Sequence, residues 1–266
     1  MRRKSRKRMA RIVIDGAITG STRKLVLKAL KQVEEREFPA LLLRVDSPGG
    51  TVGDSQEIHR ALLRVREKGC HVVASFGNIS ASGGVYIGVA AEKIVANPGT
   101  ITGSIGVILR GNNFSKLLDR IGVRFETVKS GLYKDILSPD RALTQEERDL
   151  LQSLIDSSYK QFVEAVSEGR NLSEDKVKTF ADGRVFTGSQ AKDLGLVDEL
   201  GDEETARKLA AKLANLDEKH TRTINLGRPK KKLLSFLPGS KLLYKFFNLI
   251  DIEISTNGQP LWLYSP

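Results

Sequence analysis

One cysteine, three histidines and one tryptophan are all that a chain of 266 residues contains of these types. A single cysteine, Cys70, cannot form a disulfide within the chain, which excludes a disulfide-stabilised secreted scaffold. His59, His71 and His220 show no spacing typical of a zinc site. No apolar run approaches the roughly 20 residues that a membrane-spanning helix requires.

Several common motifs are also missing. The chain has no GxxxxGK[ST] loop and no GxGxxG after a strand, so neither kind of phosphate-binding loop is predicted. Asp15 interrupts the first apolar stretch, which is therefore too short for the apolar region of a signal peptide. We expect no signal peptide or transmembrane helix in this chain, and a location that is cytoplasmic or peripheral on the inner face of a membrane.

The formal charge of +11 is concentrated in two segments. Residues 1–8 carry six basic side chains and residues 219–245 carry eight, and neither segment contains an acidic residue. The remaining 29 basic residues face 32 acidic ones, so the rest of the chain is close to neutral. Nucleic-acid binding would require basic residues interleaved with aromatics on the folded body, and that pattern is missing. Basic ends suit a polyanionic surface such as an anionic membrane.

The C-terminal region contains one apolar stretch, residues 233–250, which Pro238 and two lysines prevent from spanning a membrane. Its second half fits two structures equally well. One is a short amphipathic helix at a membrane surface, and the other is a terminal helix packed on its own domain or on a neighbouring subunit. We divide the chain into a basic arm (1–9), a folded domain (10–215) and a basic, partly amphipathic appendage (216–266).

Short apolar segments alternate with amphipathic helical patterns through the first 130 residues. This alternation predicts an α/β fold of βαβ units. A capping box from Thr144 to Glu147 then opens a long helix that should run to about Gly169, followed by further helices. The predicted strands are 11–18, 40–45, 71–75, 93–96, 105–109 and 125–128, and the predicted helices before residue 130 are 25–35, 55–67 and 82–91.

Three glycine-rich turns follow apolar strands: DSPGG (46–50), GNISASGG (77–84) and TGSIG (102–106). Ligands bind at the carboxyl ends of parallel strands, and backbone N–H groups there stabilise an anion or a developing oxyanion. Ser82, at a strand-to-helix turn before two glycines, is either a nucleophile or a helix N-cap. No histidine is well placed as its base, so a nucleophilic serine here would use a lysine, which the pattern alone does not single out.

The same stretches strongly resemble the signal peptide peptidase A (protease IV) family in its short, single-unit form. The resemblance covers roughly residues 10–210 and implies a peptidase domain with the Clp protease/crotonase-type α/β spiral and helical additions. It also implies a homo-oligomeric ring, expected to be an octamer, that degrades signal-peptide remnants and other apolar peptides without a metal or cofactor. The matching motifs are VDSPGG (45–50), residues 77–107, SGLYKDILSP (130–139), ADGRVFTG (181–188) and QAKDLGLVDELG (190–201).

The resemblance assigns roles to five residues. Ser82 matches the nucleophile, Lys134 the general base of a Ser-Lys dyad, and Ser104 the serine whose hydroxyl helps to hold the lysine. Gly49 and Gly83 match the positions whose N–H groups form the oxyanion hole. A lysine with an ordinary pKa of about 10.4 is protonated at pH 7, and a subunit interface could provide the burial that makes it a base. In the short form, the resemblance implies that serine and lysine come from neighbouring chains.

Two alternatives remain open from the sequence. A crotonase-type acyl-CoA enzyme shares the fold and a two-glycine oxyanion hole, but its chemistry does not need Ser82, Lys134 and Ser104. A non-catalytic scaffold on a membrane surface would leave the serine and the lysine dispensable. The chain departs from many relatives because MRRKSRKR stands where they carry a spanning helix, so a membrane-anchored location is not carried over.

Overall fold

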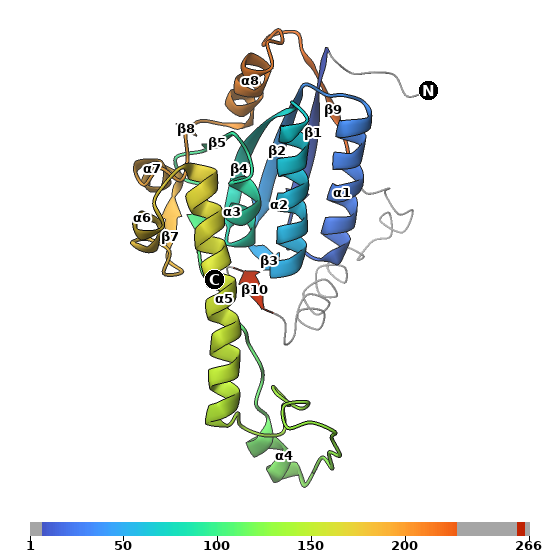
Figure 1. Cartoon of the computed structure of the whole chain (residues 1–266), viewed down its shortest axis with the longest axis vertical. Coiled ribbons are helices and arrows are strands. Elements are labelled where there is room, and N and C mark those ends of the chain that lie inside the picture. Colours follow the sequence, from blue (N-terminus) through green and yellow to red (C-terminus); the bar gives the residue numbers. More distant parts are fainter. Residues whose placement is uncertain (1–6, 228–259, 264–266) are drawn as a thin grey trace, which may run out of the picture.

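The computed structural model describes residues 7–227 and 260–263, which form an α/β body with a long helix leading to a projecting arm (Figure 1). The central sheet has the order β7–β6–β4–β2–β1–β9, with β5 paired to β4 and β8 paired to β5. All of these pairs are parallel except β6 with β7. Its strands are β1 (Arg8–Asp15), β2 (Ala40–Ser47), β4 (His71–Ala81), β5 (Lys93–Ala96), β6 (Ile101–Gly103), β7 (Val185–Thr187), β8 (Glu199–Leu200) and β9 (Arg222–Asn225).

Strand β4 has two different neighbours along its length. Its residues 73–76 pair with β5, whereas residues 79–81 pair with β6. On its other side β4 pairs with β2 throughout, across an irregularity between Val45 and Ser47. The carboxyl end of β4 is therefore enclosed between β2 and β6 at the point where the chain leaves the sheet.

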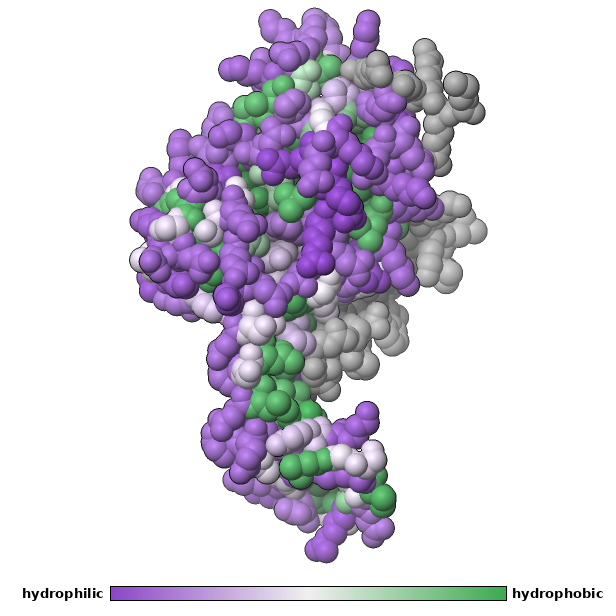
Figure 2. Space-filling view, viewed as in Figure 1, coloured by the Kyte–Doolittle hydropathy of each residue, from purple (hydrophilic) through white to green (hydrophobic). Residues whose placement is uncertain are grey.

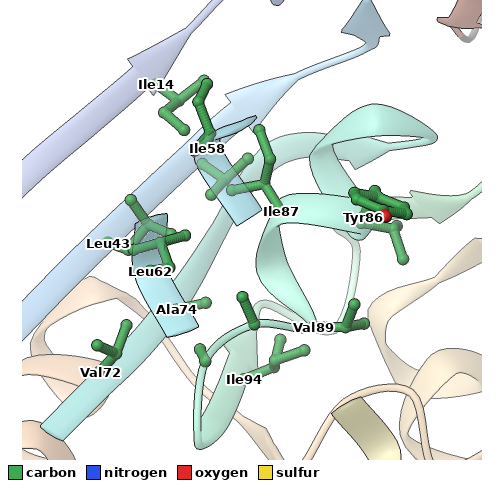
Figure 3. Close-up of a cluster of buried hydrophobic side chains, with 14 of the residues drawn as sticks. Ile14, Leu43, Ile58, Leu62, Val72, Ala74, Tyr86, Ile87, Val89 and Ile94 are labelled. Atoms are coloured by element: carbon green, nitrogen blue, oxygen red, sulfur yellow. The ribbon is translucent and has the colours of Figure 1, made fainter. Parts of the chain in front are cut away.

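Helices cover both faces of the sheet. Helices α1 (Gly20–Glu35), α2 (Val52–Glu67), α3 (Gly83–Gly88) and α5 (Gln145–Arg170) contribute to the larger core. Figure 3 shows part of it, where Leu43 of β2, Ile58 of α2 and Ile87 of α3 are fully buried. On the other face, α8 (Glu203–Leu213) packs its alanines Ala206 and Ala210 in a second cluster with strand side chains such as Leu42 of β2.

Residues 109–144, which we call the arm, project from the body together with the first half of α5 (Figure 1). The arm contains α4 (Ser115–Ile121) and irregular chain. Two further short helices, α6 (Glu174–Lys178) and α7 (Gly188–Asp193), follow α5 beside the body. Helix α5 begins with the predicted capping box, in which Thr144 and Glu147 exchange hydrogen bonds.

A second, two-stranded sheet lies beside the first glycine-rich turn. It pairs β3 (Gly49–Thr51) antiparallel with β10 (Leu261–Leu263). Strands β9 and β10 both belong to the segment predicted as an appendage, and both pair with strands of the body. The predicted amphipathic segment 241–250 lies outside the described residues.

The α/β fold and the alternation of its first elements agree with the sequence-based prediction, but two predicted strands are wrong. Residues 105–109 form only an isolated bridge, at Ile108, and residues 125–128 lie in the arm, where no sheet edge is available for pairing. Strand β4 continues to Ala81, six residues past the predicted end. None of the helices within 7–227 is long and apolar enough to cross a membrane.

Candidate active site

Ser82 occupies the sharp turn between β4 and α3. Its φ of 52° and ψ of −117° lie in a region that side-chain-bearing residues rarely adopt, at a cost of about 1–3 kcal/mol. The Ser82 N–H donates to the Gly103 carbonyl (2.8 Å), and its own carbonyl accepts from the Tyr86 N–H (3.0 Å). These bonds hold the backbone in this conformation.

The Ser82 side chain is 1% exposed, and its Oγ has no hydrogen-bond partner among residues 7–227 and 260–263. A capping serine would accept a bond from an N–H of the first helical turn, and this hydroxyl does not. Ser82 therefore occupies the N-cap position of α3, but its side chain does not cap the helix. A serine on a strained strand-to-helix turn is typical of a nucleophile. Such a turn usually exposes the hydroxyl, whereas here it is buried.

The two predicted oxyanion-hole glycines meet beside this turn. A Cβ atom at Gly49, whose φ is +105°, would lie 1.9 Å from the Trp262 carbonyl oxygen and 2.8 Å from the Gly83 nitrogen. Only glycine fits so close an approach of three backbone segments. Gly83 is the first residue of α3, where an N–H has no helical partner four residues back. In this structure the Gly49 N–H instead donates to Ser47 Oγ (3.1 Å), so its part in an oxyanion hole stays a prediction.

Ser104 lies next to the turn that carries Ser82 because β6 pairs with the end of β4. Ala81 is opposite Gly103, so Ser104 directly follows the residue that accepts the Ser82 N–H. Ser104 is 8% exposed, has a φ of 51°, and donates its N–H to the Arg184 carbonyl (2.7 Å). The structure thus brings four of the five predicted site residues together.

The fifth residue, Lys134, is not among them. It lies in the arm, in a series of turns where its N–H donates to the Gly131 carbonyl (3.2 Å), and its side chain is exposed. Its ammonium group does not bind the Ser82 hydroxyl, which has no hydrogen-bond partner within the described chain. Within one chain, the predicted base Lys134 therefore does not contact the predicted nucleophile Ser82.

Ion pairs fix the loop that carries Lys134. Asp135 binds Lys129 (2.6 Å) and Arg141 (2.9 Å), and Arg141 also binds Glu147 (2.5 Å) in the first turn of α5. The Arg141 guanidinium lowers the pKa of Asp135 well below its usual range, with a smaller contribution from Lys129. Arg141, followed by the Thr144 N–H, lowers the pKa of Glu147 to about 2. The loop is thereby tied to α5 through two ionised carboxylates.

An Arg141→Met substitution should therefore lower the melting temperature at pH 7. Carboxylates with a depressed pKa in the folded state stabilise it above their unfolded pKa of about 4, and lose that contribution as the pH falls. We expect the difference in Tm between wild type and variant to narrow from about pH 4 towards the folded pKa of Glu147, about 2. Arg148→Met, on the exposed side of the same turn, is the matched control and should melt like wild type. Equal melting of all three proteins at pH 7 would show that the ion pairs do not support the loop.

The sequence-based prediction missed β10, which passes directly over the glycines. Leu261 exchanges two hydrogen bonds with Ile108 (2.9 and 3.1 Å), and Trp262 pairs with Gly50. The only signal was the lone tryptophan in an apolar LWL triplet near the C-terminus, and no local pattern shows which strand such a triplet joins.

The comparisons with known proteins decide the family. Residues 64–217 match the profile of peptidase family S49. Protease slr0021 of Synechocystis sp. is 56% identical, over 98% of this chain and 97% of its own length. The chain belongs to peptidase family S49. It is a serine protease, which decides against the acyl-CoA enzyme and the non-catalytic scaffold.

Two further relatives of this S49 peptidase are longer proteins. Signal peptide peptidase SppA of Enterococcus faecium is 41% identical over 68% of the chain and 53% of its own length. Protease 4 of Salmonella typhi is 41% identical over the same share of the chain and 29% of its own length. The chain thus spans about half of the first of these proteins and less than a third of the second.

Solved structures confirm the predicted fold. The 1510-N membrane-bound stomatin-specific protease superposes with a TM-score of 0.57 at 14% identity, over 86% of this chain and all of that one. ClpP1 from Listeria monocytogenes gives a TM-score of 0.51 at 19% identity, over 72% of this chain and 91% of its own. The S49 peptidase has the Clp protease/crotonase-type fold.

Proposed function

We propose that this S49 peptidase is an endopeptidase in which Ser82 is the nucleophile and Lys134 of a neighbouring copy is the general base. The observation that carries the proposal is the Ser82 hydroxyl, which is buried and unpartnered at a strained turn, with Gly83 and Gly49 beside it. Among the described residues of its own chain, no base binds this hydroxyl. A site shared between copies would supply one.

The surface of the arm supports this assembly. Eleven of the fifteen large apolar side chains that are exposed in the described chain lie between Ile108 and Leu154. Figure 2 shows them gathered on the arm and where α5 leaves the body. Apolar patches of this kind mark interaction surfaces, because covering them removes apolar area from water. A second copy packed against the exposed apolar side chains between Phe114 and Leu132 would cover that part of the patch and bury the loop that carries Lys134.

In the proposed reaction, the Ser82 Oγ attacks the peptide carbonyl carbon while its proton passes to the neutral amine of the neighbouring copy's Lys134. The carbonyl oxygen becomes an oxyanion held by the Gly83 N–H and, once it turns from Ser47, by the Gly49 N–H. Ser104 orients the amine. Breakage of the C–N bond gives an acyl-enzyme, and the lysine returns its proton to the leaving amine. Water then attacks the ester, regenerating the serine.

The proposed substrates are signal-peptide remnants and other apolar peptides. A groove of about 860 Å³ runs between α5 and the arm and ends at Pro260, next to β10. Leucines from both sides, including Leu109, Leu150 and Leu154, line much of it. Transfer of an apolar peptide segment from water into such a groove is favourable. The name of the Enterococcus faecium relative supports the same substrate class.

Covalent labelling tests the nucleophile directly. A fluorophosphonate should phosphonylate the assembled protein at Ser82, with one added group per chain located by mass spectrometry after digestion. Cleavage of a fluorogenic apolar peptide should fall in proportion to the labelled fraction. Labelling at another serine, or full activity of the labelled enzyme, would contradict the assignment of Ser82.

A Lys134→Arg substitution should lower kcat by about 10²–10⁴-fold, the usual contribution of a general base. Arginine keeps the positive charge but cannot give up its proton at accessible pH. Lys116→Arg, in α4 of the same arm, is the matched control and should keep wild-type activity. A Lys134→Arg enzyme with wild-type turnover would rule out the lysine as base.

A further inference from the structure

A buried histidine, His59, binds the helix that begins directly after the proposed nucleophile. It lies in the middle of α2, and its Nδ1 is 2.7 Å from the Tyr86 carbonyl oxygen of α3. A carbonyl oxygen only accepts hydrogen bonds, so Nδ1 carries the hydrogen and donates it. Burial lowers the pKa of His59, which keeps the ring neutral at pH 7 with Nδ1 as its one donor.

The Tyr86 carbonyl belongs to the last turn of α3 (Figure 3). The N–H four residues further on, that of Ala90, donates to the Ile87 carbonyl instead (3.2 Å). The last carbonyls of a helix lack a helical partner, and a buried one needs a donor from elsewhere. Among the described residues, the donor that binds this carbonyl is His59.

Tyr86 is also bound to the turn at Ser82. Its N–H donates to the Ser82 carbonyl (3.0 Å), and the Ser82 N–H donates to the Gly103 carbonyl (2.8 Å). A series of hydrogen bonds therefore runs from α2 through Tyr86 and Ser82 to β6. The φ of 52° at Ser82 is a strained conformation, which persists only where the surrounding structure holds it. His59 forms the α2 end of this series.

Helix α2 also approaches the other end of α3. A Cβ atom at Gly83 would lie 2.8 Å from the Oγ of Ser55, which precedes His59 by one helical turn. The Ser55 hydroxyl donates to the Thr51 carbonyl (2.9 Å), so Ser55 packs against α3 while His59 binds it. The two side chains thus hold both ends of a short helix whose first N–H is the proposed oxyanion donor.

We infer that His59 is a positioning residue for peptide cleavage, because its bond to the Tyr86 carbonyl sets where α3 holds the Ser82 hydroxyl and the Gly83 N–H. A misplacement of reacting groups by about 1 Å can lower a rate about 10²-fold. The inference rests on the proposed function, since it concerns the same nucleophile. It adds a residue that acts through α3 and not on the substrate.

Two substitutions of nearly equal shape test the bond. In His59→Asn, the side-chain amide places an N–H where Nδ1 was, because both nitrogens are attached to Cγ. His59→Leu places a methyl group there and removes the donor. His71→Leu, at the start of β4, is the matched control. The readouts are kcat and KM for a fluorogenic apolar peptide and the rate of fluorophosphonate labelling at Ser82, on assembled protein well below the melting temperature of each variant.

We expect His59→Leu to lower kcat and the labelling rate by about 10- to 100-fold while KM stays within about twofold, because the folded site is misplaced. His59→Asn should keep both rates near wild type, although it loses the ring that contacts Tyr86 at 4.8 Å between centroids. His71→Leu should also match wild type. A His59→Leu enzyme with wild-type kcat would overturn the inference. A His59→Asn enzyme as slow as His59→Leu would also overturn it, since shape and not the donor would then matter.

His59→Gln provides a second comparison if His59→Leu does not fold. Its amide nitrogen lies one bond further from the backbone, beyond the place of Nδ1, so this variant should be about 10- to 100-fold slower than His59→Asn. Equal activity of the two amides would contradict the inference. If neither His59→Leu nor His59→Gln folds, the bond supports the whole fold and the inference is wrong. Failure of the proposed function is seen separately, because wild type itself would then not be labelled at Ser82.

Discussion

A Ser82→Ala enzyme is expected to cleave a fluorogenic apolar peptide at least about 10⁴-fold more slowly than wild type. The substitution removes the oxygen that forms the acyl-enzyme, and nothing else in the turn depends on it, because Oγ has no partner among the described residues. Alanine meets the same backbone requirement as serine at a φ of 52°. The melting temperature should therefore stay close to that of wild type while activity is lost.

Ser80 offers a matched control two residues earlier, on strand β4. Its side chain is fully buried, and its Oγ is likewise unpartnered within the described residues. Ser80→Ala removes the same kind of oxygen close to the same turn without touching the proposed nucleophile, so peptidase activity should remain near wild type. If Ser80→Ala were as inactive as Ser82→Ala, loss of activity would report a disturbed strand and not a lost nucleophile.

The parts of the fold that the sequence predicted well depend on local patterns. Helix α5 begins at its predicted capping box and runs one residue past the predicted end, because the cap is complete within four residues. Strands β2 and β5 each contain a short apolar run, Ala40–Leu43 in β2 and Ile94–Ala96 in β5, and both strands occupy the interior of the sheet, as such runs favour. The position of each of these elements is therefore determined by residues that are close together in the sequence.

The wrongly predicted strand at residues 125–128 and the missed strand β10 have a different physical cause. Residues 125–128 carry the apolar side chains of a strand, but Phe125 and Val128 are exposed on the arm. An apolar segment that faces a partner surface has the same composition as one that faces a core, so its pattern cannot distinguish them. Strand β10 was missed for a related reason, since its pairing with β3 joins residues more than 200 positions apart.

For the candidate site too, the part that depends on local sequence was predicted and the part that depends on distant contacts was not. The glycine-rich turns predicted where Ser82, Ser104, Gly49 and Gly83 meet, because the carboxyl ends of neighbouring strands share one edge of a sheet. The absence of a capping bond from the Ser82 side chain could not be predicted from the sequence, because it depends on the torsion angles at the turn. In the proposed function, the position of Lys134 relative to Ser82 depends on a surface between two chains, and neither the local sequence pattern nor a single copy contains that surface.

Rings that mix two inactive variants should regain activity if the site is shared. Ser82→Ala rings and Lys134→Ala rings are each expected to be inactive. After dissociation and reassembly in equal amounts, a site is complete when a Lys134→Ala chain supplies the serine and a Ser82→Ala neighbour supplies the lysine. Each choice has a probability of one half, so about a quarter of wild-type activity should return. A site built within one chain would give none.

A second mixture also distinguishes a site shared between two chains from a site built within one chain, this time by how much activity is lost. When wild-type chains are mixed equally with chains that carry both Ser82→Ala and Lys134→Ala, shared sites need two wild-type neighbours and about a quarter remain active. If each site were built within one chain, half of the sites would remain active. Native mass spectrometry confirms that the rings are mixed, and the two ratios together then identify the arrangement. The shared site would be refuted if the first mixture regained no activity and the second kept half of the wild-type activity. The general base would then have to lie in the same chain as Ser82. Because Lys134 is exposed on the arm and Ser82 is buried in the body, we expect a quarter in both.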